Sequence, residues 1–252
     1  MALTTQVTSP ETLSRVRWVL GQVLVVVVGI FVYFRIRGIT DASVDVARAH
    51  ADDIVSLERW LGIDVEGTVQ APVAASQSLA TAANWVYVWG HWPVILTTMV
   101  WLVWQHRDAF RRLRDGMLVS GFLGMAVFVS YPVAPPRLFD RGLVDTVTES
   151  SEAYRYLQPP AFVNQYAAMP SLHAGWDLLV GLAVLGAAAS FGLKAVAALM
   201  PTLMVWAVVA TANHYVLDVV AGVVLALIGH AVALHLERQR SKNRAEVGAD
   251  LG

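Results

Sequence analysis

The chain has 252 residues, of which 56% are hydrophobic and 15% are charged, and its mean hydropathy is +0.55. Soluble domains carry about 25% charged residues, so this composition is typical of a membrane protein. The formal net charge is −1 and there is no cysteine, which argues against a nucleic-acid-binding protein, a disulfide framework and a thiolate metal site.

Six apolar segments follow one another along the chain, each about as long as a helix must be to cross the hydrocarbon core of a bilayer. We therefore expect an all-α fold, a six-transmembrane helical bundle over residues 16–236. It lies between a cytoplasmic tail, 1–15, and a charged cytoplasmic tail without regular structure, 237–252. The expected spans are 18–34, 82–104, 117–133, 174–191, 196–212 and 215–234.

The basic residues predict the orientation of these spans. An even number of spans leaves both termini on one side of the membrane. The segments on that side hold 11 of the 18 lysine and arginine residues, including four arginines in the short connection at 105–116. Because short cytoplasmic connections are enriched in Lys and Arg, we expect an integral plasma-membrane protein with both termini cytoplasmic.

The connection between the first two spans, 35–81, then faces outward. Four apolar residues recur there at helical spacing and predict an extracytoplasmic amphipathic helix that lies on the membrane surface. They are Val46, Ile54, Leu57 and Leu61. Glu58 falls in the same stretch, where it either packs against the active face or is solvated.

Two histidines mark the beginnings of two expected spans. His173 ends the stretch PSLH at 170–173, and His214 begins the stretch HYVLD at 214–218. The separation of 41 residues is about enough for one span inward and one span back, so both histidines return to the outer face. Arg137 reaches the same face, because it follows the proline-rich stretch YPVAPPR that ends the third span.

These side chains suit phosphoryl transfer. Asp218 follows His214 by about one helical turn, so its carboxylate can hold one ring nitrogen and leave the other to act as a nucleophile. His173 can then serve as an acid. The helix start near Ser171 offers backbone N–H groups to an anion, and Arg137 adds a bidentate positive fork.

At these motifs the chain resembles the type-2 phosphatidic acid phosphatase superfamily, over nearly its whole length after the N-terminal tail. PSLH at 170–173 resembles the P-S-G-H motif of that family, and HYVLD at 214–218 resembles the H-x-x-x-D end of its third motif. The chain departs from the family pattern at three positions. Leu172 replaces a glycine, Val208 stands where the third motif has an arginine, and Ser130 stands where the first motif has a lysine.

These departures resemble a branch of the superfamily that includes the inositol phosphorylceramide synthases, whose first motif is similar to APPR at 134–137. The resemblance implies a nucleophile, its orienter and an acid that protonates the leaving alkoxide. It also implies two phosphate binders. In that order the residues are His214, Asp218 and His173, followed by Arg137 and Ser171. For the missing arginine we expect a substitute that also binds phosphate, either Arg141 or Tyr215.

The resemblance implies an integral membrane lipid-phosphate phosphatase or phosphotransferase that works through a phosphohistidine at the extracytoplasmic face, without a metal or a cofactor. The expected partners are a lipid phosphate or diphosphate substrate and membrane lipids, and no nucleic acid. Water and an alcohol such as inositol can both attack a phosphohistidine. Hydrolysis therefore stays open beside transfer of a phospho-headgroup such as phosphoinositol between lipids, as do the lipid itself and the oligomeric state.

Two other classes of protein fit single features of the chain. A transporter can use the histidines as a proton relay, although transporters place ionisable groups near the membrane midplane and in matching halves. A metal-dependent hydrolase can bind zinc through His173, His214 and Asp218. His91, in the second expected span, either lines the site or is a hydrogen-bonded core residue, and we favour the core residue.

Overall fold

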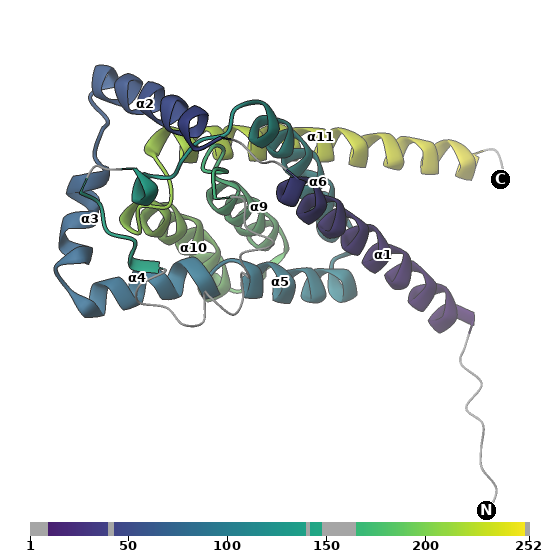
Figure 1. Cartoon of the computed structure of the whole chain (residues 1–252). Coiled ribbons are helices and arrows are strands. Elements are labelled where there is room, and N and C mark those ends of the chain that lie inside the picture. Colours follow the sequence, from purple (N-terminus) through teal and green to yellow (C-terminus); the bar gives the residue numbers. More distant parts are fainter. Residues whose placement is uncertain (1–9, 40–42, 140–141, 148–164, 250–252) are drawn as a thin grey trace, which may run out of the picture.

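The computed structural model describes residues 10–39, 43–139, 142–147 and 165–249, and it is built from helices (Figure 1). Within those ranges the β-structure is limited to a single bridge between Val133 and Ala167, which confirms the all-α prediction. The helices are α1 (Pro10–Ile39), α2 (Val44–Leu61), α3 (Glu66–Ala74), α4 (Gln77–Trp89), α5 (Trp92–Gln105), α6 (Arg107–Ser130), the 3-10 helix η1 (Pro136–Leu138), α9 (Leu172–Ala187), α10 (Phe191–Ala210) and α11 (Val216–Ala249).

Four helices of the described chain, α1, α6, α10 and α11, are long and apolar enough to cross a membrane. The pair α4 and α5, bent by 40°, makes a fifth candidate if the two helices cross as one broken span rather than as a re-entrant loop, and α9 is a shorter apolar helix of 16 residues. A sixth span would require α9, so the count of six stays a prediction. The second expected span, 82–104, is not one helix. It breaks before α5, whose first turn contains Pro93, a residue that cannot donate the hydrogen bond needed to continue α4.

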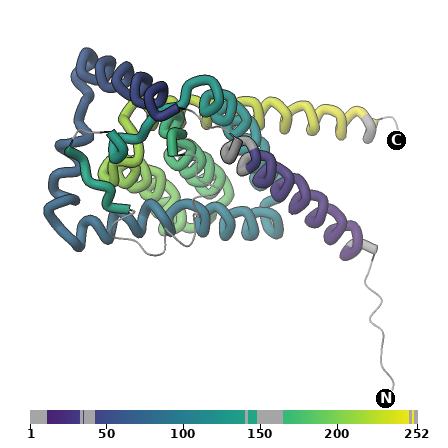
Figure 2. Tube along the Cα trace, in the orientation of Figure 1, coloured from purple at the N-terminus to yellow at the C-terminus, as the bar shows by residue number. Residues whose placement is uncertain are grey.

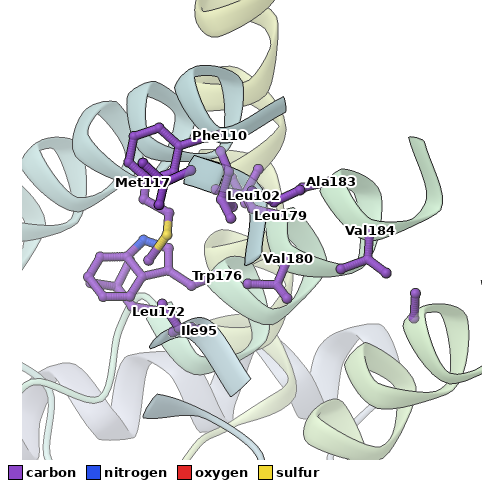
Figure 3. Close-up of a cluster of buried hydrophobic side chains, with 14 of the residues drawn as sticks. Ile95, Leu102, Phe110, Met117, Leu172, Trp176, Leu179, Val180, Ala183 and Val184 are labelled. Carbon is purple, nitrogen blue, oxygen red and sulfur yellow. The ribbon is translucent and has the colours of Figure 1, made fainter. Parts of the chain in front are cut away.

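The helix α9 lies inside the bundle, packed against α6, α10 and α11, while α11 runs along α6 (Figure 1). Figure 2 shows that α1 and the C-terminal part of α11 extend away from the other helices. Buried side chains fill the space around α9 (Figure 3), where Trp176 and Leu179 cluster with Phe110 and Met117 of α6. The indole N–H of Trp176 donates to Ser120 Oγ at 3.2 Å, so its polar group is satisfied within the core.

Glycines let the backbone of α11 come into direct contact with the backbones of α9 and α6. A Cβ placed on Gly222 would lie 2.0 Å from the carbonyl oxygen of Ser171, and one on Gly229 would lie 2.4 Å from that of Gly116. A Cβ on Gly175 of α9 would lie 2.5 Å from the carbonyl oxygen of Gly222. Small residues at helix contacts are typical of membrane proteins, where close packing drives helix association. The starts of α9 and α11 are thereby held side by side.

The expected amphipathic helix forms as α2, and it presents two different faces. Its small residues Ala47 and Ala51 are fully buried, and Ala47 accepts a hydrogen bond from the backbone of the segment after α6. Of the expected apolar stripe only Ile54 is buried. The other three residues are 45 to 47% exposed: Val46, Leu57 and Leu61. An apolar outer face suits a helix at a membrane surface, and its extracytoplasmic location stays a prediction.

Both ends of the chain contain more helix than expected. The first helix begins at Pro10, inside the expected tail, and α11 continues to Ala249 through the segment expected to lack regular structure. Ion pairs tie this extension to α6. Arg112 makes two hydrogen bonds of 2.9 Å to Glu237, and Arg240 lies 2.7 Å from Asp115.

Candidate active site

The starts of α9 and α11 bring two histidines together, as their spacing in the sequence predicts. The ring centroids of His173 and His214 lie 6.1 Å apart. The backbone N–H of Ser171 donates to the carbonyl oxygen of Asp218 at 2.9 Å, which joins the two helix starts directly. His214 is 6% exposed, whereas His173 is only half-buried. The two rings form the centre around which the other polar groups are arranged.

One hydrogen bond determines which nitrogen of His214 carries a hydrogen. Nδ1 lies 2.7 Å from the carbonyl oxygen of Ala168, which can only accept, so Nδ1 is the donor. In the neutral imidazole Nε2 is then the nitrogen with a free electron pair. The expected orienter, Asp218, lies farther away, with Oδ2 at 3.5 Å from Nδ1. The carbonyl therefore orients the ring, and the carboxyl group of Asp218 lies beside it.

The Ala168 carbonyl is positioned by the segment that follows α6. The N–H of Val133 donates to the carbonyl of Tyr166 at 2.7 Å, and the N–H of Ala168 donates to the carbonyl of Val133 at 3.2 Å. The sequence did not indicate this contact, because every residue has a backbone carbonyl. No side-chain pattern marks the one that binds a histidine 46 residues away.

Asp218 and Ser171 are both fully buried, and each fixes a helix start. Asp218 Oδ2 accepts from the backbone N–H of Tyr215 at 2.9 Å, and Ser171 Oγ caps α9 by accepting from the N–H of Ala174 at 3.5 Å. The sequence predicted a Ser171 N–H available to phosphate. That group is instead engaged, because the start of α11 supplies the carbonyl of Asp218 as its acceptor.

Arg137 reaches the centre from the segment after α6. Its guanidinium donates a hydrogen bond to Oδ1 of Asn213, the residue that precedes His214 in the chain. Its Nε lies 3.1 Å from Oδ2 of Asp145. The side chain is 11% exposed. A guanidinium has five N–H groups, more than these two contacts use, so the fork is held in place and can still bind an anion.

Two buried glutamates cap the start of α11 on the side of α2. Glu58 Oε1 accepts from the N–H of Leu217 at 2.8 Å, and Glu66 Oε1 accepts from the N–H of Val216 at 3.0 Å. Burial, together with the neighbouring Glu66, raises the pKa of Glu58 to about 8. Glu58 thus packs on the active face and is mainly protonated at neutral pH.

A cluster of possible metal ligands lies at the same place. The ligand atoms of Glu58, Asp64 and Glu66 all lie within 4.8 Å of one another. Asp64 is paired with Arg59 at 3.0 Å. The two histidines and the aspartate that the zinc alternative requires do not form such a group within the described residues.

His173 contacts groups that the sequence analysis did not assign to the site. The ring of Tyr87 stacks on it with 4.6 Å between centroids, and the ring of His91 lies 4.1 Å away. His91 Nδ1 lies 2.8 Å from Asp177 Oδ1, and both side chains are 3% exposed. His91 is thus a hydrogen-bonded core residue, as we favoured, and it also borders the site. The sequence contained one signal for this, since Asp177 follows His173 by four residues as Asp218 follows His214.

Two of the three departures from the family motifs, Leu172 and Val208, have structural explanations. Leu172 is buried and packs toward Gly124 of α6, where a Cβ on the glycine would lie 3.0 Å from its Cδ2. Val208 is fully buried, and its carbonyl accepts two N–H groups of the turn before α11, each at 3.1 Å. Leu172 thus packs α9 against α6, and Val208 holds the turn before α11. Of the two expected substitutes for the missing arginine, Arg141 lies outside the described residues and Tyr215 is fully buried.

The fold and the site together define a class of protein: a helical membrane bundle with a histidine pair at the starts of two neighbouring helices. The chain belongs to the PAP2 superfamily, whose sequence profile matches residues 52–232. Its fold is similar to that of the crystal structure of LpxE from Aquifex aeolicus, with a TM-score of 0.53 and 15% sequence identity. The alignment covers 69% of this chain and 94% of that chain. No curated protein matches the sequence.

Proposed function

We propose that the protein is an integral membrane lipid-phosphate phosphatase that works through a phosphohistidine on His214. The observation that carries this proposal is the hydrogen bond from Nδ1 of His214 to the Ala168 carbonyl, because it leaves Nε2 as a nucleophile. Membership of the PAP2 superfamily supports phosphatase activity, and the apolar helices support a substrate that itself resides in the membrane.

In the first step Nε2 of His214 attacks phosphorus, and the bond between phosphorus and the lipid oxygen breaks. His173 donates its proton to that oxygen, so the lipid leaves as a neutral alcohol. The phosphorylated imidazole keeps its hydrogen on Nδ1 and carries a positive charge. The Ala168 carbonyl at 2.7 Å and Asp218 Oδ2 at 3.5 Å both lie beside Nδ1 and stabilise that charge.

In the second step water attacks the phosphorus of the phosphohistidine. His173, neutral after the first step, takes a proton from the water while the phosphorus–nitrogen bond breaks. Inorganic phosphate leaves, and both histidines return to their starting states. The guanidinium of Arg137, held by Asn213 and Asp145, offers hydrogen bonds and positive charge to the phosphoryl oxygens in both steps.

We place this site on the extracytoplasmic side of the plasma membrane, with both termini in the cytoplasm. The distribution of Lys and Arg supports this orientation. The ion-paired end of α11, where Glu237 binds Arg112 at 2.9 Å, is the end opposite to His214 and is rich in basic residues. Lipid phosphates that reach the histidines would then come from the outer face.

An alcohol in place of water in the second step would make the protein a phosphotransferase. The motifs PSLH and HYVLD, which resemble those of the inositol phosphorylceramide synthase branch, support this alternative. In such a transferase His214 would take phosphoinositol from one lipid, which leaves as an alcohol, and the hydroxyl group of a second lipid would then attack the phosphorus and accept the phosphoinositol. The nucleophile and the acid would be the same, so one set of assays separates the two activities by their products.

The test is phosphate release by the purified, detergent-solubilised protein from a panel of lipid phosphates in the presence of EDTA. Wild-type protein should release phosphate, and His214→Ala should not. His235→Ala, an exposed histidine on α11 far from the centre, is the matched control and should retain full activity. A folded His214→Ala protein with near-normal release would exclude the phosphohistidine. A new phosphoinositol lipid that forms only when a phosphoinositol lipid and a second lipid with a free hydroxyl group are both added would identify a transferase, and inositol phosphate formed from a lipid phosphate and inositol would identify phosphoryl transfer to inositol.

A further inference from the structure

A third histidine, with a carboxylate of its own, lies directly behind His173. His91 stands at the break between α4 and α5, and its ring is tilted by 33° to that of His173, with 4.1 Å between centroids. Its Nδ1 lies 2.8 Å from Oδ1 of Asp177, and each of the two side chains is 3% exposed. The two reaction steps described above make no use of either residue.

Stability does not account for this pair. Ionisable side chains inside a helical membrane bundle are costly, and even a well-formed buried pair often adds no more stability than apolar residues of the same size. Asp177 Oδ2 also has no hydrogen-bond partner among the described residues, so the carboxylate is only partly satisfied. A purely structural need between α5 and α9 would be met better by apolar side chains.

The contacts of Asp177 differ from those of its counterpart on α11. Asp218 faces its own histidine, four residues earlier, at 3.5 Å. Asp177 also follows a histidine by four residues, yet its oxygen binds His91, and the His91 ring contacts His173. Tyr87 stacks on the same imidazole at an interplanar angle of 18°. The His173 ring therefore cannot turn without losing two ring contacts.

We propose that His91 and Asp177 form a positioning pair that holds the ring of His173 in the orientation in which it donates its proton to the leaving lipid alkoxide. The inference rests on the proposed function, in which His173 is the acid. Asp177 accepts the hydrogen of His91 Nδ1 and fixes the His91 ring. That ring, together with Tyr87, fixes His173.

The dependence on the leaving group tests this role. A lipid alkoxide needs a proton in order to leave, whereas para-nitrophenolate leaves without one. The second-order constant kcat/KM includes only the steps up to departure of the leaving group, whereas kcat also includes the attack of water, which uses His173 with every substrate. His91→Phe and Asp177→Asn should therefore lower kcat/KM for dioctanoyl phosphatidic acid about 10- to 100-fold, but lower kcat/KM for para-nitrophenyl phosphate less than about threefold. Asp177→Glu, which keeps an acceptor for His91, should recover part of the lost kcat/KM.

His106→Phe is the matched control. His106 ends the same helix, α5, at the opposite end from His91, and it also makes a ring contact, with Trp101 at 4.9 Å. This variant should leave both substrates unaffected. If His214→Ala is inactive, but His91→Phe and Asp177→Asn lose kcat/KM equally with both substrates or lose none, the positioning role is overturned and the proposed function stands. A wild-type protein that releases phosphate from no lipid of the panel, and none from para-nitrophenyl phosphate, overturns both.

Discussion

Replacing Gly222 by alanine tests whether the reacting groups depend on the close contact between α9 and α11. The new Cβ would lie 2.0 Å from the carbonyl oxygen of Ser171 and 2.8 Å from its carbonyl carbon. Ordinary contacts begin near 3.4 Å, so the two backbones would have to separate by about 1.4 Å at this point. No side-chain rotation can relieve the contact, because the atoms that the Cβ meets belong to the backbone.

That separation acts directly on the centre. Ser171 precedes His173 by two residues, and its N–H binds the carbonyl of Asp218 at 2.9 Å, one helical turn after His214. A misplacement of about 1 Å can lower the rate about 100-fold, so we expect a loss of this size in kcat with little change in KM. Overpacking of a tight contact costs about 1 to 3 kcal/mol, so the protein should fold with a lower thermal midpoint.

Phosphate release at saturating substrate measures kcat, and the fluorescence of the nine tryptophans during heating gives the midpoint of unfolding. Gly21→Ala is the control, because a Cβ there has nothing within 4 Å, and it should keep both values. Gly229→Ala, which would meet the Gly116 carbonyl oxygen at 2.4 Å, should lower the midpoint with a smaller loss of kcat. A folded Gly222→Ala protein whose kcat stays within about threefold of the wild type would refute this reasoning.

The buried Glu58 should make stability depend on pH. The folded protein keeps this proton up to about pH 8, whereas the unfolded chain loses it near pH 4.5, so stability falls as the pH rises between these values, by at most about 5 kcal/mol. Glu58→Gln should flatten the thermal midpoint over this range, and an unchanged slope would contradict the assignment. Arg137→Lys keeps the charge but loses the planar fork, so KM for a lipid phosphate should rise about tenfold; an unchanged KM would argue against contact with phosphate. Because the chain has no cysteine, single cysteines report topology. Thr68→Cys should react with a membrane-impermeant maleimide in intact cells and Ala245→Cys only after lysis, and the reverse pattern would place the site in the cytoplasm.

The meeting of His173 and His214 could be predicted from span lengths, because a chain that crosses a bilayer and returns must come back to the surface it left. The hydrogen-bond partner of His214 could not be predicted from the sequence. It is the carbonyl group of Ala168, in a segment that is held to Val133 by a single β-bridge. The break at His91 was hidden by apolar residues on both of its sides. Pro93 was the available signal for it.

At the C-terminal end of the chain, the local composition was compatible both with a helix and with a segment without regular structure. The charged residues after 237 suggested a segment without regular structure, yet Glu, Arg, Lys and Ala are good helix formers. Extending an existing helix also avoids the cost of nucleation, so α11 continues to Ala249. The pair of His91 and Asp177, 86 residues apart, needed the three-dimensional arrangement of α5 and α9.

The length of α11 has a consequence for how the protein sits in a bilayer. Its 34 residues rise about 1.5 Å each, which gives a rod of about 50 Å against a hydrocarbon core of about 30 Å. Arginines near its far end, such as Arg240 beside Asp115, cannot sink into the hydrocarbon at low cost. With α11 across the bilayer as we propose, that end would fix the depth of the rod from one leaflet, while His214 would stand at the other. Bilayer thickness would then control how closely a phosphate headgroup can approach the proposed nucleophile.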